Sequence, residues 1–261
     1  MESLFLKKGC WEIIMRRYRI VVAYDGTNYC GWQVQPNGIT VEEVLNKKIS
    51  KITGEDIHII GASRTDSGVH SMGNVAVFDT NTSIPPEKFM HALNQKLPDD
   101  IVIVKSDEVA KDWHPRYQDE VLKTYEYHIY NSKIPNPLKR YFSTFVSFPL
   151  DVERMREGAK YLVGEHDFVS FCNVRTQVED TVRTVKEIKI LQDNENITIR
   201  ITGNGFLYNM VRIVAGTLIR VGRGYYEPEH VKEILEAKER TEAGVTAPAN
   251  GLVLVEIKYG E

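Results

Sequence analysis

The chain has 261 residues, of which 42% are hydrophobic and 26% charged, a composition that excludes a disordered, collagen-like or membrane-embedded protein. No apolar run reaches the roughly 20 residues needed to span a bilayer, and residues 7–9 interrupt the start where a signal peptide would continue. Cys10, Cys30 and Cys172 lack the spacing of zinc or redox sites. We therefore expect a cytoplasmic globular protein with reduced cysteines and no membrane contact.

The net charge of -3 counts against a polyanionic partner, because nucleic-acid affinity depends largely on Lys and Arg that neutralise phosphates. However, residues 227–242 contain six Glu and only three basic residues, so they account for the whole net charge and the rest of the chain is neutral. Basic residues gather at 16–19, 139–140 and 212–223. Each group is interpreted equally well as a local nucleic-acid contact or as a solvated surface.

The first predicted elements are a strand and a helix. Apolar residues alternate from 18 to 24, which is typical of a strand with one buried face. Helical spacing of apolar residues follows at 41–52, after a capping box formed by Thr40 and Glu43. The chain thus begins with the order strand, helix.

Two short β-branched runs come next, at 57–62 and 74–78, and they flank a polar loop at 61–71. A helix at 86–96 and a strand at 101–104 follow. The order of elements in this part of the chain is therefore βαββαβ.

The rest of the chain repeats that order, with one acidic helix inserted before the last strand. The predicted elements are a strand at 121–130, a helix at 152–163, strands at 181–190 and 197–202, a helix at 207–221, the acidic helix at 229–240 and a strand at 253–259. The repeated order predicts an α+β fold of two ferredoxin-like βαββαβ halves with antiparallel sheets. We expect an N-terminal extension at 1–15, a first half at 16–112 and a second half at 113–261.

The loop between the second and third strands is the first candidate for chemistry, because it places Arg64, Thr65 and Asp66 close to Gly68 and His70. Asp, Ser and Gly form turns readily, so a plain turn is one interpretation. The other is a carboxylate beside a guanidinium, which could act as a nucleophile or base. The spacing alone leaves both open.

Several long stretches of the chain resemble the TruA family of tRNA pseudouridine synthases. They are Tyr-Asp-Gly-Thr-Asn-Tyr-Cys-Gly-Trp-Gln-Val-Gln at 24–35, Arg-Thr-Asp-Ser-Gly-Val-His at 64–70, Trp-His-Pro-Arg at 113–116, Lys-Thr-Tyr-Glu-Tyr at 123–127, Ser-Phe-Cys at 170–172, the 203–224 region and Ala-Pro-Ala-Asn-Gly-Leu at 247–252. The resemblance covers about residues 18–259.

The resemblance implies a catalytic centre that draws on both halves. Asp66 would act as nucleophile or base on a flipped-out uridine, whether on its base or its sugar. Arg64 would help to swing the uridine from its stack, and Tyr125 would stack on the uracil. Arg212 would pair with Asp66 and keep it ionised. Independently of the resemblance, Gly216, one turn further along the same helix, costs helix stability, and either close packing or an approaching backbone would justify that cost.

The resemblance also implies the substrate and the assembly. Gln33, His114 and Arg116 would contact RNA in a central cleft between the halves. The substrate would be the anticodon arm of tRNA, with uridines at about positions 38–40, and the enzyme would be a homodimer. Ser63 stands where the family usually has glycine, so a positive φ there would strain the loop. Lys123 replaces the more usual arginine.

Other function classes are less well supported. A zinc-dependent nucleobase deaminase needs His-x-Glu and Pro-Cys-x-x-Cys, and a nucleotide-binding enzyme needs a complete glycine-rich phosphate loop; the sequence has neither. A non-catalytic RNA-binding protein or RNA chaperone remains the alternative, since it would keep the basic and aromatic surface without needing Asp66. The isomerisation is redox-neutral, so we expect no metal and no cofactor.

Overall fold

The computed structural model describes residues 15–173 and 179–260. The first six elements are β1 (Arg16–Tyr24), α1 (Val41–Thr53), β2 (Ile60–Gly61), β3 (His70–Thr80), α2 (Pro86–Asn94) and β4 (Ile101–Val109). Their order is the predicted βαββαβ. The expected N-terminal extension lies outside the described residues, apart from Met15.

The remaining elements contain the predicted strands and helices together with two short strands and three short 3-10 helices that the sequence did not indicate. They are β5 (Leu122–Asn131), η1 (Pro137–Lys139), β6 (Thr144–Val146), α3 (Val152–Lys160), β7 (Gly164–Asp167), η2 (Val169–Phe171), β8 (Val182–Asp193), β9 (Asn196–Gly203), α4 (Met210–Gly222), α5 (His230–Ala237), η3 (Ala249–Gly251) and β10 (Leu252–Lys258). The mixed α+β class is confirmed.

The strands of the described residues form one continuous ten-stranded sheet, in the order β4-β1-β3-β10-β5-β9-β8-β7, with β2 on β3 and β6 on β5. Most pairs are antiparallel. The last strand, β10, joins the two predicted halves because it pairs in parallel with β3, through Val253 opposite His70 and Leu254 opposite Ser71. The two predicted halves therefore share one sheet and do not form separate sheets. β10 pairs with the part of the β3 edge that β2 does not cover, so that this edge is not exposed.

The second strand is much shorter than the predicted run at 57–62. The backbone N–H groups of Ile57 and Ile59 donate to the side chains of Ser50 and Asn46 on α1 instead of to another strand. The β-branched run is therefore extended but pairs with β3 only at its end. The capping of α1 is as predicted, since the Thr40 hydroxyl accepts from the N–H of Glu43.

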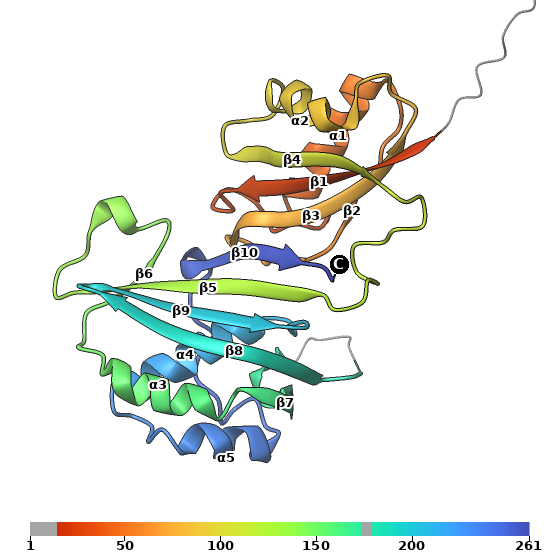
Figure 1. The fold of residues 1–261 in the computed structure, drawn as a ribbon. Helices are drawn as coiled ribbons and strands as arrows, with labels where there is room; N and C mark the ends of the chain where they lie inside the picture. Colours follow the sequence, from red (N-terminus) through yellow and green to blue (C-terminus); the bar gives the residue numbers. More distant parts are fainter. Residues whose placement is uncertain (1–14, 174–178, 261) are drawn as a thin grey trace, which may run out of the picture.

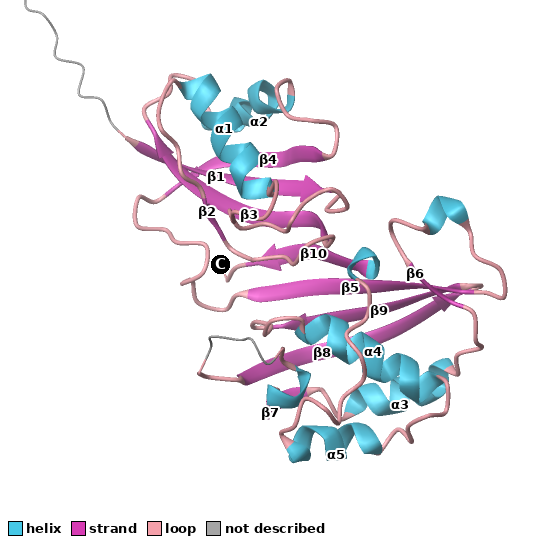
Figure 2. Ribbon diagram, turned by 180° about the vertical axis from the view of Figure 1, so that it is seen from behind, coloured by secondary structure: helices cyan, strands magenta, loops and turns pink. Residues whose placement is uncertain are grey.

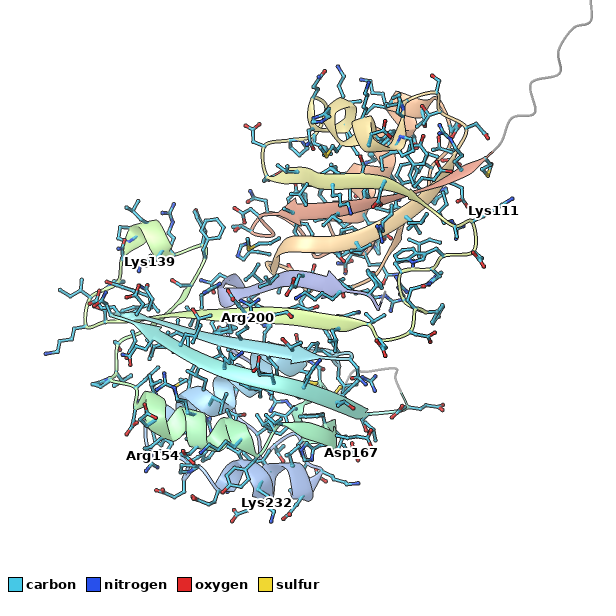
Figure 3. The ribbon with its side chains drawn as sticks, viewed as in Figure 1. Lys111, Lys139, Arg154, Asp167, Arg200 and Lys232 are labelled. Atoms are coloured by element: carbon cyan, nitrogen blue, oxygen red, sulfur yellow. The ribbon has the colours of Figure 1, made fainter. Side chains whose placement is uncertain are left out.

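All the labelled helices lie on one face of the sheet, the face toward the viewer in Figure 2 and away from the viewer in Figure 1. Under α1 and α2, one core is built on Tyr18, Ile20 and Val22 of β1. The second core packs α3, α4 and α5 against β5, β8 and β9. The opposite face of the sheet carries charged side chains such as Arg200, labelled in Figure 3, which pairs with Glu126.

Within the part of the chain that the structure describes, no helix has the length and apolar character that crossing a membrane would require.

Candidate active site

The loop of residues 62–69, between β2 and β3, is fixed by the segment that follows β1. The hydroxyl of Thr65 is 2.7 Å from that of Tyr24, and its carbonyl accepts from the N–H of Trp32 at 3.1 Å. Gly31, with φ +85°, lies so close that a side chain there would overlap the carbonyl of Thr65. The loop is therefore a rigid platform rather than a free surface turn.

At the centre of the loop, Asp66 meets Arg212 from α4. Nη1 of Arg212 donates to Oδ2 of Asp66 at 3.2 Å, and the two side chains are only 17% and 21% exposed. The same guanidinium donates to the side-chain oxygen of Asn209 at 3.0 Å and to the carbonyl of Ala247 at 2.8 Å. Residues 146 positions apart in the sequence thus form one ion pair with a fixed geometry.

The ion pair does not hold the Asp66 pKa below its ordinary value. Burial raises the pKa of the Asp66 carboxyl, and Arg212 opposes this rise without cancelling it. The implied pairing with Arg212 is present, but the balance of effects leaves Asp66 a stronger base than an exposed aspartate.

Asn209 supports Arg212 from an unusual backbone conformation. It stands just before α4 with φ 62° and ψ 6°, in the left-handed region, which costs a non-glycine residue roughly 1–2 kcal/mol. Its side chain makes no capping bond to the helix and accepts from Arg212 instead. The strained position therefore delivers one of the acceptors that orient the guanidinium.

The Ala247 contact depends on the close approach of α4 to the chain that precedes β10. The N–H of Ala247 donates to the carbonyl of Arg212 at 3.1 Å. A side chain at Gly216 would overlap the carbonyl oxygen of Val245. Of the two reasons expected for a glycine in this helix, close packing or an approaching backbone, the structure shows the approaching backbone. This approach brings the Ala247 carbonyl to Arg212.

Asp66 lines a pocket of about 750 Å³ on the helical face of the sheet. The ring of Tyr125, on β5, also lines it, is 7% exposed and packs edge-on against Phe206 at 5.2 Å. Burial raises the pKa of Tyr125 to about 12, so its hydroxyl is protonated at neutral pH. A carboxylate and an aromatic ring thus share a pocket large enough for a nucleoside.

Basic side chains line another part of the same pocket, and we call them the basic wall: Arg64, Arg116, Lys123 and Arg183. Nε of Arg116 donates to the carbonyl of Gly61 at 2.7 Å, and Nζ of Lys123 donates to that of Ala62 at 3.0 Å. Arg64 is exposed. Among the ion pairs of the described residues, none involves a member of this wall. Glu42 attracts Arg116 only from beyond ion-pair distance, so the wall keeps a net positive charge.

Most of the predicted site residues come together. Gln33, Arg64, Asp66, Arg116 and Tyr125 line the pocket, and Arg212 contacts Asp66.

The two histidines of the predicted motifs lie elsewhere. His114 is outside the pocket lining and stacks on Tyr117, with 4.4 Å between ring centroids. His70 is buried: its Nδ1 accepts from the N–H of Gly26 at 3.1 Å, and its Nε2 is 2.8 Å from the carbonyl of Tyr141. These contacts give His70 a structural role and leave His114 at a distance from Asp66.

The replacement of glycine by Ser63 does not strain the loop, because Ser63 is not among the residues with a positive φ. The amide of Asn74 bridges it instead, accepting from the N–H of Ser63 at 3.2 Å and donating to its carbonyl at 3.0 Å. The backbone conformation here is one that any residue adopts, so serine is tolerated.

Sequence reasoning missed four residues of the site: Asn209, Ala247, Arg183 and Phe206. Ala247 acts through its backbone carbonyl, which leaves no trace in residue type. Arg183 lies in a run interpreted only as a strand, and Phe206 lies just before the predicted helix at 207–221, in a region of the family resemblance that implied no role for it. A signal existed for Asn209, since asparagine is one of the few residues that adopt the left-handed conformation beside a helix end.

Among the described residues, no group of three or more His, Cys, Asp or Glu side chains is placed to hold a metal ion. Cys30 and Cys172 are free thiols, and Cys10 lies outside the described residues.

The comparisons with known proteins agree with this geometry. Residues 20–118 and 159–260 match the family model described as tRNA pseudouridine synthase. A tRNA pseudouridine synthase A of Thermoanaerobacter sp. (strain X514) is 50% identical over 245 residues, which are 94% of this chain and 100% of that protein. A tRNA pseudouridine synthase A of Brevibacillus brevis is 46% identical over 245 residues, again 94% of this chain and 100% of that protein.

A solved structure of an H/ACA RNP bound to a substrate RNA containing 2'-deoxyuridine aligns with 92% of this chain and 47% of that chain, at 13% identity and a TM-score of 0.30, a likeness too weak to support an argument. The 50% identity with the curated enzyme from Thermoanaerobacter extends over 94% of this chain. This chain therefore belongs to the tRNA pseudouridine synthase family, isomerases that convert uridine in tRNA to pseudouridine.

Proposed function

We propose that Asp66 is the catalytic carboxylate of this isomerase and that the pocket between the loop of residues 62–69 and the start of α4 receives the flipped-out uridine. The observation that carries the proposal is the ion pair of Asp66 and Arg212, two partly buried charges held 3.2 Å apart beside the ring of Tyr125. The carboxylate of this pair lines a cavity of about 750 Å³, and a buried carboxyl with a raised pKa in such a cavity is typical of a functional site.

The reaction breaks the bond between N1 and C1' of uridine and forms one between C5 and C1'. C5 then loses its hydrogen as a proton, N1 gains a proton, and no electrons enter or leave. The Asp66 carboxylate supplies the nucleophile or base for this exchange. Its raised pKa makes it more basic, and Arg212 remains close enough to stabilise the ionised form.

The remaining site residues position the RNA. The Tyr125 ring offers a face on which uracil stacks. Arg64, exposed at the pocket mouth, occupies the place that the flipped base leaves in its stack. Gln33 and Arg116 contact the RNA backbone, with Arg116 neutralising phosphate charge. His114, which lies outside the pocket lining, contacts RNA only beyond the target nucleotide.

The assignment of Asp66 is tested by tritium release from tRNA that carries 5-tritiated uridine. Wild-type protein releases tritium, while Asp66→Ala and the nearly isosteric Asp66→Asn release none above background and still bind tRNA. The alternative function, a non-catalytic RNA-binding protein or RNA chaperone, predicts tRNA binding with no release by the wild type. Release that persists in Asp66→Ala would overturn the assignment of Asp66.

We further propose the anticodon arm as the substrate, with uridines at about positions 38–40, each of which must leave a helical or stacked environment to be reached. The support is the family resemblance together with a pocket open to a basic wall. Since tRNA acts in the cytoplasm, the enzyme acts there too. Mapping pseudouridines in tRNA from a strain without the protein tests this: loss confined to these positions is expected, and loss only elsewhere would contradict it.

The proposed cleft follows from a division of the chain into two ferredoxin-like halves, 16–112 and 113–261. The strand order supports it, because β4-β1-β3 and β10-β5-β9-β8 arrange corresponding strands of the two βαββαβ units alike. Asp66 and Arg64 come from the first unit, and Tyr125 and Arg212 from the second. The pocket therefore lies where the two units meet.

The enzyme is proposed to act as a homodimer whose second copy covers the helix-free face of the sheet. That face has an apolar patch of Met72, Val102, Phe142 and Val253, which line a cavity of about 380 Å³, and Met72 and Phe142 are 61% and 53% exposed. A two-fold contact would place the patch of one copy against that of the other.

Light scattering on the full chain tests the dimer. Wild type is expected to be a dimer and Phe142→Asp a folded monomer, while an exposed control, Leu138→Asp, stays dimeric. A wild type that is monomeric at micromolar concentration would contradict the proposal.

The expectation that no metal takes part is tested separately. Full activity in EDTA is predicted, and loss of activity in EDTA would count against this expectation.

A further inference from the structure

The basic wall contains more positive charge than the described residues balance. Arg116 and Lys123 donate to backbone carbonyls at the end of β2 and in the loop that follows it, whereas Arg183 donates to carbonyls of its own segment, those of Asp180 and Val182. No carboxylate pairs with any of the three among the ion pairs of the described chain. Buried or crowded cations without partners are unfavourable in a folded protein. Their convergence on one pocket indicates an anionic ligand.

Lys123 is the most enclosed of these cations. Lys123 lies two residues from Tyr125 on the same face of β5, so the two side chains leave the strand roughly 7 Å apart. Burial, together with the nearby guanidiniums of Arg116 and Arg183, lowers the pKa of Lys123 to about 8. Its ammonium group has three donors, of which the carbonyl of Ala62 takes one.

The charged groups that face Lys123 come from three directions. Arg116 lies in the segment before β5 and Arg183 on β8, and both act on Lys123 directly. Behind them, Arg116 is repelled by Arg64 of the loop of residues 62–69 and attracted by Glu42 of α1. The carboxylate in the same pocket, Asp66, is engaged by Arg212. The surroundings of Lys123 therefore carry more positive than negative charge, and a bound anion would offset part of the excess.

We propose that Lys123, with Arg116 and Arg183, forms a subsite for a backbone phosphodiester of tRNA next to the target uridine, and that Lys123 takes up a proton from solvent as the phosphate binds. The subsite rests on the proposed placement of the uridine against Asp66 and Tyr125. A phosphodiester supplies the negative charge that the cluster lacks and accepts the free donors of Lys123.

Proton uptake makes tRNA affinity depend on pH in a defined direction. Below about pH 8 Lys123 is already protonated in the free enzyme, so binding needs no proton. Above that pH the free enzyme loses the proton while the complex keeps it, and affinity falls as pH rises. An arginine at this position stays charged throughout, because a guanidinium does not lose its proton in this pH range.

The test measures the dissociation constant of unmodified substrate tRNA for the full chain between pH 7 and pH 9.5 at constant salt. Wild type is expected to weaken about tenfold or more over this range. Lys123→Arg should bind with little change over the range. Lys186→Arg, a matched change at an exposed lysine on β8, should follow the wild type.

Lys123→Met provides a second readout that does not depend on titration. It should bind weakly at every pH and lower the slope of log affinity against log salt by about one. Circular dichroism at pH 7 checks its fold, and Lys123→Arg carries the test alone if it does not fold.

Superimposable pH profiles of wild type and Lys123→Arg would overturn the subsite. Tritium release by the same preparations at pH 7 separates this failure from a failure of the proposed catalytic function. Release with identical pH profiles rejects only the subsite, whereas no release by the wild type rejects the function itself.

Discussion

Two groups of charged residues line or adjoin the pocket, and they differ in whether each charge has a partner of opposite sign. Asp66 and Arg212 neutralise each other, and Asn209 and Ala247 fix the guanidinium further. The basic wall, which lines another part of the pocket, has cations whose hydrogen-bond acceptors among the described residues are backbone carbonyls. The difference indicates a division of labour: the groups proposed for chemistry are preorganised before the substrate arrives, whereas the groups proposed for binding remain unsatisfied until RNA supplies phosphate.

The largest effect after loss of Asp66 itself is expected for Arg212→Met. Removing the guanidinium should lower the single-turnover rate of tritium release roughly 100- to 1,000-fold, as for other preorganised electrostatic groups. The acid limb of the pH-rate profile should also move to higher pH, because Arg212 opposes the rise that burial causes in the Asp66 pKa. An unchanged rate and profile between pH 5 and pH 8 would show that the pair is only structural.

The next largest effect is expected for Tyr125→Ala. It should lower kcat/KM roughly 10- to 100-fold, the usual cost of removing an aromatic stacking partner of a base. Tyr125→Phe, which keeps the ring, is expected to stay within about threefold of wild type. Steady-state kinetics on substrate tRNA checks both. A large loss in Tyr125→Phe would mean that the hydroxyl, rather than the ring, does the work.

A smaller effect is expected for Asn209→Gly. Glycine keeps the left-handed backbone but removes the side-chain acceptor of Arg212. The single-turnover rate should fall about two- to tenfold, and the acid limb should shift in the same direction as in Arg212→Met. Asn209→Ala should in addition melt at a lower temperature, because alanine is strained at φ 62°. An acid limb identical to that of wild type would assign Asn209 a purely structural role.

The smallest effect concerns stability. Because burial raises the Asp66 pKa in the folded state, ionised Asp66 opposes folding at neutral pH. Protonated Asp66 does not have this unfavourable effect. The free energy of unfolding is therefore highest below the pKa of Asp66 in the unfolded chain, and it falls as pH rises through the higher pKa of Asp66 in the folded protein. Asp66→Asn should therefore melt at or a few degrees above the wild-type temperature at pH 7, with the difference vanishing near pH 3. A melting temperature clearly below wild type at pH 7 would mean that the ion pair stabilises the fold.

The sequence predicted local features well where a residue type has a specific structural role, such as capping a helix or allowing a backbone to come close. Thr40 caps α1 as its position before the helix indicated, and Gly216 admits the carbonyl of Val245. The run at 57–62 was only partly a strand, because the side chains of Ser50 and Asn46 took the backbone donors that a neighbouring strand would have used.

Long-range geometry was accessible only through the family resemblance. The resemblance implied the contact of Asp66 with Arg212, which the structure confirms at 3.2 Å. It did not reveal that β10 would join both halves in one sheet, since two residues of parallel pairing leave no pattern in the sequence. Nor did it reveal the carbonyl of Ala247, because every residue has one.

The most direct test of the division of labour compares Asp66→Asn with Arg116→Gln in two measurements, the dissociation constant for tRNA and the single-turnover rate of tritium release at saturating enzyme. The account predicts that Asp66→Asn binds tRNA within about threefold of wild type and releases no tritium. Arg116→Gln should bind more weakly, with a salt slope lower by about one, and react at nearly the wild-type rate once saturated. Tritium release by Asp66→Asn, or a slow saturated rate with unchanged affinity in Arg116→Gln, would contradict it.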